Sequence, residues 1–164
     1  MDAAAIHQRL KVRFEAGVGD CDLQAKDPFI MVEPAAIVDV SRFLHDDPEL
    51  RFDCLSNQSG VDYKAKGVIE VVYHLFSYPQ RHHIVLKVDA PRDHPEVPTV
   101  EGVWKAANWH EREIYDLLGV VFTGHSDLRR LLMPEDWIGH PLRKDFVEPE
   151  EYHGISTRRE SLLR

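Results

Sequence analysis

Apolar residues in the first third of the chain recur at the spacing of helices. Ile6, Leu10 and Phe14 lie four residues apart, on one face of a helix that we predict over 3–15. The short apolar run 29–32 predicts a buried strand. A second helix is predicted next, because a proline suited to a first helical turn precedes an apolar stripe. The residues that carry this second prediction are Pro34, Ile37, Val40, Phe43 and Leu44.

From residue 50 onward the apolar positions follow the two-residue period of β-strands. The segment 67–78 is rich in β-branched and aromatic residues, and 83–89 alternates apolar and polar positions. Strands and helices in this order predict an α+β fold with two layers. It combines a mostly antiparallel sheet, helices packed on one face and an extended C-terminal arm. The predicted strands cover 50–55, 61–63, 67–78 and 83–89, with turns at 56–60 and 79–80.

A third helix is predicted after a proline-rich loop. The loop covers 90–98, which contains three prolines. Asn108 followed by Glu111 has the spacing of a capping box at the start of a helix. The helix should end at Gly119, since glycine is the usual residue just beyond a helix C-terminus.

Beyond this helix the regular apolar pattern ends. Pro134, Gly139 and Pro141 interrupt the chain and indicate an extended arm that cannot form a core of its own. We therefore expect a core domain over 1–125 and an arm with a tail over 126–164. The last part of that tail, from residue 148, has few apolar residues, and we expect it to be disordered in the isolated chain.

Composition narrows the function classes. The net charge of -8 argues against nucleic acid binding, which requires clustered lysine and arginine. No apolar run approaches the ~20 residues that span a bilayer, and the N-terminus lacks a signal-peptide pattern. We expect a cytoplasmic chain that contacts a membrane only through partners. Cys21 and Cys54 are expected to be packing residues, because two thiols cannot hold a usual iron-sulfur cluster.

Motifs for chemistry are incomplete. His110-Glu111 begins a zinc-binding H-E-x-x-H pattern, but Ile114 occupies the place of the second histidine. Adjacent His82 and His83 should point to opposite faces of a strand and cannot easily share an ion. No nucleophile motif, dinucleotide motif or phosphate-binding loop is present in the sequence. A stand-alone metal-dependent hydrolase, using histidines with Asp127 or Asp136, is the remaining enzymatic alternative.

The segment 108–146 concentrates arginine, carboxylate and aromatic side chains. Arginine and aromatic residues are enriched at protein interfaces, which favours an inter-subunit interface. Bidentate arginine–carboxylate pairs could instead brace the arm against its own domain, and a solvated charged surface is the third interpretation. The charges can divide between the first two roles. The candidate residues are Glu111, Arg112, Glu113, Tyr115, Asp116, His125, Asp127, Arg129, Arg130, Glu135, Asp136, Trp137, Arg143, Lys144 and Asp145.

This segment resembles the signature of the 30 kDa subunit family of respiratory complex I. The resemblance covers roughly 67–146, and it departs from the commonest pattern only at Leu118 and Ser126. Its residues include Tyr73-His74-Leu75, Val97-Pro98, Val103-Trp104-Lys105, Asn108-Trp109, Glu111-Arg112-Glu113, Tyr115-Asp116, Gly119, Phe122, Gly124-His125, Asp127-Leu128-Arg129-Arg130, Leu132-Met133-Pro134-Glu135-Asp136, Gly139 and Pro141-Leu142-Arg143-Lys144-Asp145.

The resemblance implies a non-redox core subunit in the peripheral arm of proton-translocating NADH:quinone oxidoreductase. It would dock beside the quinone-site subunit, which forms much of the quinone pocket, and would contact other hydrophilic-arm subunits. FMN and iron-sulfur clusters are expected in the partner subunits, with no catalytic, cofactor or metal residues in this chain. The implied location is the cytoplasmic side of the bacterial inner membrane. The alternative is the equivalent subunit of a membrane-bound nickel-iron hydrogenase or of a ferredoxin-fed complex.

Overall fold

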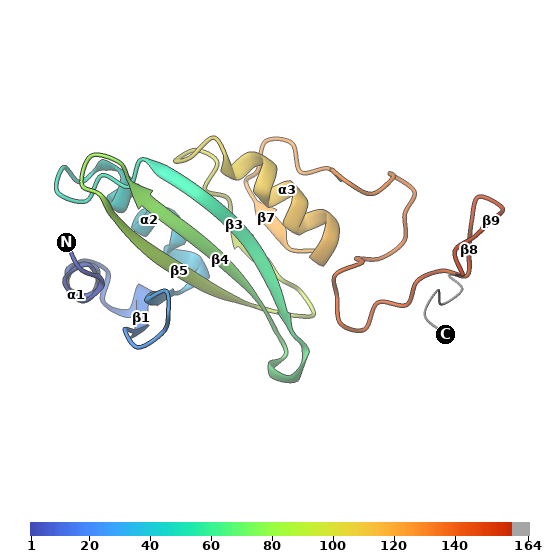
Figure 1. Ribbon diagram of the computed structural model, residues 1–164, viewed down its shortest axis with the longest axis horizontal. Coiled ribbons are helices and arrows are strands. Elements are labelled where there is room, and N and C mark those ends of the chain that lie inside the picture. The colour runs from blue at the N-terminus through green and yellow to red at the C-terminus, as the bar shows by residue number, and fades with distance from the viewer. Residues whose placement is uncertain (159–164) are drawn as a thin grey trace.

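The first helix forms as its apolar spacing predicts. The structure is a computed structural model that describes residues 1–158 (Figure 1). Helix α1 (Ala3–Phe14) is capped by the side chain of Asp2, which accepts a backbone N–H of the first turn. Ile6 and Leu10 are fully buried, and a short 3-10 turn ends the helix.

An unpredicted strand precedes the second helix. Strand β1 (Val18–Asp22) pairs antiparallel with β2 (Phe29–Val32), the strand that was predicted. A 3-10 turn at Pro34–Ala36 then leads into helix α2 (Ile37–Asp46). The proline stands at the start of this turn, as predicted, because it needs no backbone N–H there.

Five strands form the main sheet, in the order β1-β2-β5-β4-β3. The long strands are β3 (Cys54–Tyr63), β4 (Val68–Ser77) and β5 (His82–Pro91), which form an antiparallel meander. Only the pairing of β2 with β5 is parallel within this sheet. The prediction of a mostly antiparallel sheet is confirmed, and His82 is buried while His83 is exposed, as expected for strand neighbours.

Two local predictions in this region were wrong. Residues 56–60 were predicted as a turn but lie inside β3, with a bulge between Leu55 and Asn57. Gly60 has no positive φ, so its role is spatial: a Cβ there would lie 2.4 Å from Leu118 Cδ1. Small polar residues suit this strand because a helix packs closely against it. In the segment 50–53, predicted as strand, residue 50 ends a turn and 51–53 have no regular secondary structure before β3.

The proline-rich segment also contains regular structure. Strand β6 (Glu96–Pro98) lies within the predicted loop and pairs in parallel with β7 (Val121–Thr123). Strands this short leave no clear alternation in the sequence. This small second sheet places the segment that precedes the arm against the core.

Helix α3 (Ala107–Leu118) forms the first part of the segment 108–146, which is called the signature segment below. It begins one residue before the predicted cap, and no side chain caps its first turn. The predicted capping box is therefore wrong. Glu111 instead points into the interior, where it accepts hydrogen bonds from Thr99 and Val100. The predicted end at Gly119 is confirmed, with φ of 76°.

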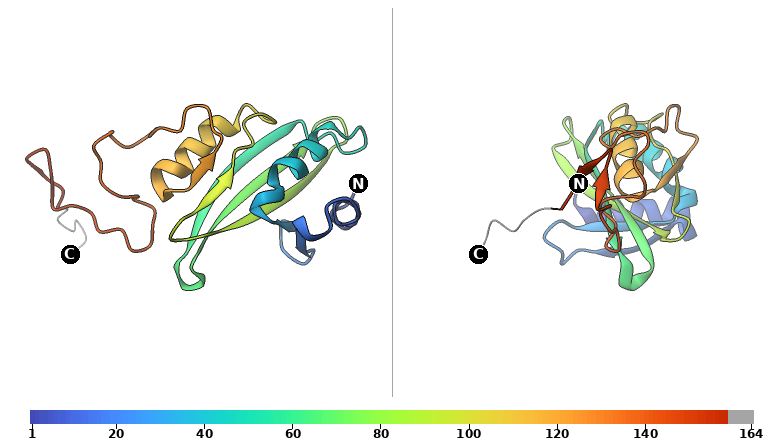
Figure 2. Two further views of the ribbon diagram at one scale, coloured as in Figure 1. Left: turned by 180° about the vertical axis from the view of Figure 1, so that it is seen from behind. Right: turned by 90° about the vertical axis from the view of Figure 1, so that its right-hand side faces the viewer.

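The helices lie on one side of the sheet and enclose the core with it (Figure 2). The apolar face of α1 and α2 meets the inward residues of β2, β4 and β5, while α3 packs against β3. The two-layer α+β prediction is confirmed. Large core residues that are fully buried include Ile6, Leu10, Ile30, Leu44, Phe52, Ile69, Tyr73, Leu75, Ile84 and Phe122.

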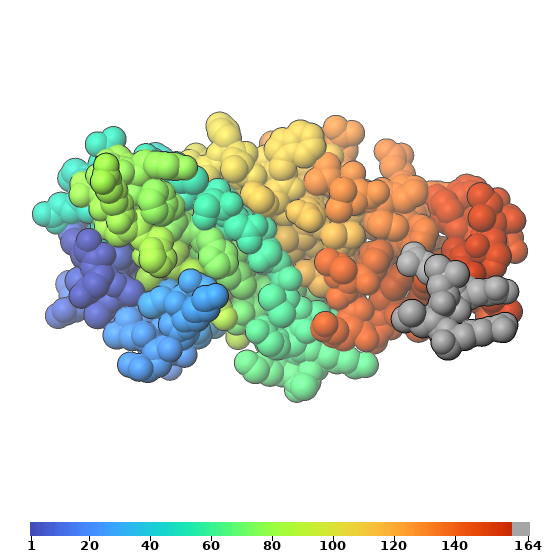
Figure 3. Space-filling model, in the orientation of Figure 1, coloured from blue at the N-terminus to red at the C-terminus, as the bar shows by residue number. Residues whose placement is uncertain are grey.

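The arm, residues 126–158 as described, leaves the core beyond β7. It extends to the end of the molecule opposite α1 (Figures 1 and 3). Its last part forms a hairpin of β8 (Glu151–Tyr152) and β9 (Ile155–Ser156), where the sequence predicted no regular structure. The prediction for 159–164 falls outside the described residues.

Candidate functional site

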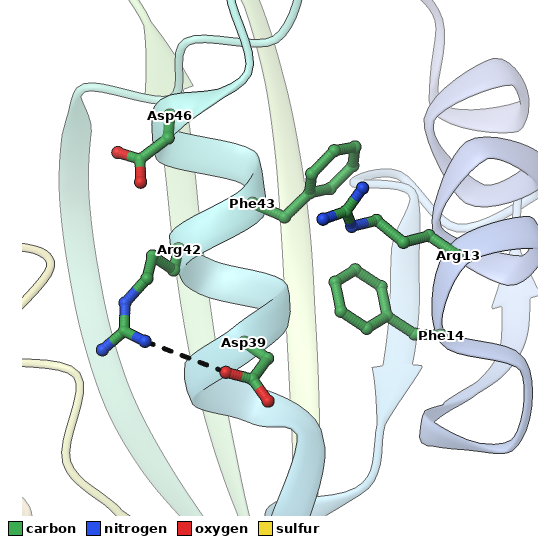
Figure 4. A pocket seen from close by; sticks show the side chains of 6 residues that line it. All are labelled: Arg13, Phe14, Asp39, Arg42, Phe43 and Asp46. Atoms are coloured by element: carbon green, nitrogen blue, oxygen red, sulfur yellow. Dashed lines mark ion pairs between the residues drawn. The ribbon is translucent and has the colours of Figure 1, made fainter.

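A surface cavity of about 550 Å³ lies between α1 and α2 (Figure 4). The Arg13 guanidinium lies 4.7 Å from the centre of the Phe43 ring, and Arg42 pairs with Asp39 at 3.9 Å. Its lining contains neither a histidine nor a nucleophilic side chain, and none of the predicted site residues. The lining residues are Arg13, Phe14, Asp39, Arg42, Phe43 and Asp46.

Many residues of the signature segment 108–146 instead form clusters of hydrogen bonds and ion pairs between α3, β3 and the arm. Each such cluster is called a tie below. Asp116, fully buried in α3, is the centre of the first tie. Its Oδ1 pairs with Arg130 Nη1 at 2.7 Å. Its Oδ2 accepts three consecutive backbone N–H groups, from Leu131, Leu132 and Met133, at 3.0, 2.7 and 2.8 Å. One carboxylate thus fixes the turn of the arm that follows Arg130.

The hydrogen bonds decide the charge state of Asp116. Burial alone would raise the pKa of this carboxyl, because a charge in a poorly solvated place is costly. The hydrogen bonds from Met133, Arg130, Leu132 and Leu131 outweigh that cost and hold the pKa below its usual value. Asp116 is therefore an anion that is stabilised by the arm itself.

Two arginines extend this tie. Arg112 is buried, and its Nε and Nη2 donate to the carbonyl oxygens of Arg129 and Arg130, both at 3.3 Å. Arg130 Nη2 in turn donates to the carbonyl oxygens of Trp137 and Gly139, at 2.8 and 3.2 Å. The guanidinium groups therefore satisfy backbone carbonyls in a segment that has no ladder of its own.

A second tie holds the middle of the arm to β3. Asp62 has a buried side chain, and Arg92 binds both of its oxygens at 2.8 and 3.0 Å. The Lys144 N–H donates to Asp62 Oδ2 at 2.8 Å, and Asp145 pairs with the same arginine. The hydrogen bond from Arg92 lowers the pKa of Asp62 in spite of burial. These contacts join residues far apart in the sequence.

The arm is also hydrogen-bonded to the end of α3. Arg143 Nε donates to the carbonyl oxygen of Leu118 at 2.7 Å, and the Leu142 N–H donates to that of Leu117 at 3.0 Å. These carbonyls lie in the last turn of a helix, where no further helical N–H is available to them. A Cβ on Gly119 would lie 2.5 Å from His140 Nε2, so glycine also admits the arm at this point.

The beginning of the arm is fixed by a polar cluster around His125. The Asp127 N–H donates to His125 Nδ1 at 3.0 Å, which leaves Nε2 to donate to the Asn108 carbonyl oxygen at 3.1 Å. Glu101 accepts hydrogen bonds from Asn108 Nδ2 at 2.6 Å and from the Ser126 N–H at 2.7 Å. His125 thus helps to fix this loop by hydrogen bonding.

Glu111 lies beneath this cluster and is fully buried. Desolvation raises the pKa of its carboxyl, although Thr99, Val100 and the nearby His125 act in the opposite direction. Its Oε1 accepts the Val100 N–H at 2.9 Å. Glu111 thus supports the segment between β6 and α3 from inside the core and offers no surface to a partner.

The outer arm packs on itself through aromatic rings. Trp137 and Phe146 stack with ring centres 6.5 Å apart, and Tyr152 lies 5.2 Å from Trp137. The Tyr152 hydroxyl donates to Asp136 at 2.7 Å. Gly139 (φ 86°) lies close under the Phe146 ring, where a Cβ would approach to 3.1 Å. The arm has this local aromatic cluster, although it was predicted to lack a core.

The predicted site residues divide between internal ties and the surface. Glu111, Arg112 and Asp116 are buried. The half-buried residues are Tyr115, His125, Arg130, Trp137 and Arg143, while Glu113, Asp127, Arg129, Glu135, Asp136, Lys144 and Asp145 are exposed.

Three residues of the ties were not predicted: Asp62, Arg92 and Glu101. Asp62 occupies an ordinary strand position, and Arg92 lies in the proline-rich segment, so neither has a local signal in the sequence. Each binds a part of the arm more than 20 residues away along the chain. Only the folded structure brings these pairs together.

Within residues 1–158, no group of three or more histidine, cysteine, aspartate or glutamate side chains could hold a metal ion. Cys21 and Cys54 are free thiols. Across the same described range, no helix has the length and apolar character needed to cross a membrane. The geometry is that of an arm that is held to the core by buried charged residues such as Asp116 and Asp62.

Comparison with known proteins identifies relatives over most of the chain. The profile of the family described as "Respiratory-chain NADH dehydrogenase, 30 Kd subunit" matches residues 30–152. An NADH-quinone oxidoreductase subunit of Roseiflexus sp. (strain RS-1) is 50% identical, over 88% of this chain and 84% of the relative. The equivalent NADH-quinone oxidoreductase subunit of Chlorobium phaeobacteroides is 41% identical, over 93% of each chain.

Two solved structures share the fold. One is the trypsin-resistant fragment (1-134) of Nqo5, with a TM-score of 0.59 and 26% identity. It covers 75% of this chain and 98% of that fragment. The other is a chain of the membrane-bound sulfane sulfur reductase, an archaeal respiratory membrane complex, with a TM-score of 0.66 and 25% identity. It covers 88% of this chain and 85% of the neighbour.

Proposed function

The chain belongs to the family of the 30 kDa subunit of respiratory-chain NADH dehydrogenase, and on that premise we propose that it serves as a docking subunit of NADH:quinone oxidoreductase. In this role it stands in the peripheral arm of the complex, beside the quinone-site subunit. The complex transfers electrons from NADH through FMN and iron-sulfur clusters to quinone and couples this transfer to proton translocation. The redox groups belong to the partner subunits.

The observation that carries this proposal is the braced arm. Residues 126–158 extend from the core (Figure 1), and buried charges hold the part of this segment up to Asp145 against the core. A preorganised surface of this kind needs little further ordering on binding, which favours a role in an assembly. The chain would then contribute to electron transfer by holding its neighbours in position.

The proposed docking role also suggests how the chain divides into domains. We assign residues 1–125 to the core domain and the rest to the arm with its tail. The Nqo5 fragment that matches this chain is described as trypsin-resistant, which supports a protease-stable core. Limited trypsin digestion of the free chain should cut within the arm before it cuts within the main sheet. Earlier cleavage within the main sheet would contradict this division.

The location follows from the proposed assembly. We place the chain on the cytoplasmic side of the bacterial inner membrane, peripheral and attached through partner subunits. The alternative is the equivalent subunit of a membrane-bound nickel-iron hydrogenase or of a ferredoxin-fed complex. One observation favours it, the fold similarity to a chain of an archaeal respiratory membrane complex. The higher identity to several NADH-quinone oxidoreductase subunits favours the first assignment.

Affinity purification from the native host in mild detergent tests the proposal. A tagged copy should recover the quinone-site subunit together with flavin- and iron-sulfur-containing subunits, identified by mass spectrometry. Recovery with the catalytic subunit of a hydrogenase would instead support the related complex. A chain recovered alone, with a stoichiometric metal ion, would contradict both assignments and return the stand-alone hydrolase to consideration.

A further inference from the structure

The outer arm exposes large apolar side chains. Five of the eleven exposed large apolar side chains among residues 1–158 belong to the arm. Ile138 is 88% exposed and Val147 is 84% exposed, the two highest values in that set. Water-exposed branched side chains are costly to leave uncovered when they gather in one segment.

The aromatic cluster brings these two side chains onto one short loop. Ile138 follows Trp137 and Val147 follows Phe146, and the two rings stack with centres 6.5 Å apart. The ring of Phe146 also lies close over Gly139. The exposed apolar residues are therefore presented by a locally packed loop rather than by a free tail.

The charged residues around this loop are mostly acidic. Between 135 and 151 there are six carboxylates and two cationic side chains. Asp136 and Asp145 are engaged by hydrogen bonds or an ion pair within the chain, and Arg143 donates to a helix carbonyl. The remaining acidic residues that are exposed and have no ion-pair partner among the described residues are Glu135, Glu148 and Glu151. Lys144 is the one exposed cation of this segment whose side chain has no ion pair among the described residues, so its unpaired charges are mostly acidic.

We propose that Ile138 and Val147, together with the acidic residues Glu135, Glu148 and Glu151 of the same segment, form the contact surface of the arm. Its occupant is a polypeptide surface of a neighbouring subunit that presents an apolar groove bordered by lysine and arginine. Complementary charge would steer the encounter, and burial of the two branched side chains would hold the pair together. The buried signature charges around Asp116 shape this surface without touching the partner. The inference rests on the docking function proposed above.

The test uses the full chain, tagged and expressed in its native host, with the co-purifying subunits quantified by mass spectrometry. The double variant Ile138→Ser/Val147→Ser should recover at least about tenfold less of the NADH:quinone oxidoreductase subunits than the wild type. Val12→Ser is the matched control, because Val12 is 78% exposed but lies on α1, and its recovery should equal that of the wild type. Thermal unfolding of the purified variants should be unchanged, since all three side chains are exposed.

A second variant tests the contribution of the three acidic residues. Glu135→Gln/Glu148→Gln/Glu151→Gln should make recovery less sensitive to the salt concentration of the wash than it is for the wild type. If Ile138→Ser/Val147→Ser recovers as much of the partner subunits as the wild type does, the proposed contact surface is wrong and the docking function still stands. Failure of the wild type itself to recover these subunits would overturn both. Recovery only of untagged copies of the same chain would overturn the proposed occupant.

Discussion

The carboxylate of Asp116 receives hydrogen bonds from one arginine and from three consecutive backbone N–H groups of the arm. In a helix or sheet these N–H groups would find carbonyl partners along a ladder, but the arm has no ladder here. A buried anion takes that place. At the scale of single residues, the Asp116 carboxylate supplies the acceptors that secondary structure would otherwise provide.

Replacement of this carboxylate should therefore destabilise the protein. We expect Asp116→Asn to lower the free energy of unfolding by about 2–4 kcal/mol, since an amide cannot accept as many bonds and leaves Arg130 without its anion. Urea unfolding of the purified chain measures this. Asp127→Asn, at an exposed position, is the matched control and should leave the unfolding free energy unchanged. Equal stability of the two variants would contradict the role of Asp116 as a tie.

Asp116 should also make the stability of the protein depend on pH. The folded protein lowers the pKa of Asp116, so its contribution to stability is complete above the unfolded value of about 3.9. It is lost as the pH falls through the lower folded pKa. The stability difference between wild type and Asp116→Asn should hold constant from pH 7 to about pH 5 and shrink below about pH 4. A difference that stayed constant to acidic pH would show that the carboxylate charge is not the cause.

At the scale of elements, the contact between α3 and β3 sets where the arm begins. Gly60 permits this contact, because any Cβ there would meet Leu118 at 2.4 Å. We expect Gly60→Ala to destabilise the protein by about 1–3 kcal/mol, as overpacked sites usually do. Gly102→Ala is the control, since a Cβ at Gly102 meets nothing within 4 Å. Thermal unfolding of both variants, with a loss only for Gly60→Ala, would confirm the close approach.

The elements with a strong period were predictable from the sequence. The helical stripe of Ile6 and Leu10 and the alternation in 83–89 each reflect a buried face, and both gave the correct element. The turn predicted at residues 56–60 was wrong because serine, asparagine and glycine usually favour turns. In the structure, strand pairing with β4 and the approach of α3 overrode that local preference.

The candidate site was predictable only in part, for a related reason. The signature segment contains several of the residues that hold the arm, but its sequence does not show which of them face inward. Glu111 has the spacing of a cap, yet its side chain serves a loop from inside the core. Asp62 and Arg92 lie 82 and 53 residues along the chain from the arm residues that they contact. Such pairings depend on tertiary structure, which periodicity along the chain does not encode.

At the scale of the whole molecule, the arm projects from the end opposite α1 (Figure 3), and we propose that the core and the arm have different roles. The proposed role of the chain within its complex is structural, since its charged signature residues position the arm. Loss of the arm surface should then reduce the quantity of assembled enzyme more than the turnover of the enzyme that does assemble.

The most direct measurement compares these two quantities in membranes of the native host. Cells that carry Ile138→Ser/Val147→Ser in place of the wild-type chain are solubilised, and the complex is quantified on native gels. NADH:quinone turnover is then expressed per assembled complex. We predict at least about tenfold less complex, with turnover per complex within about twofold of wild type. A normal amount of complex with lost turnover would contradict the docking role and place this chain in the chemistry itself.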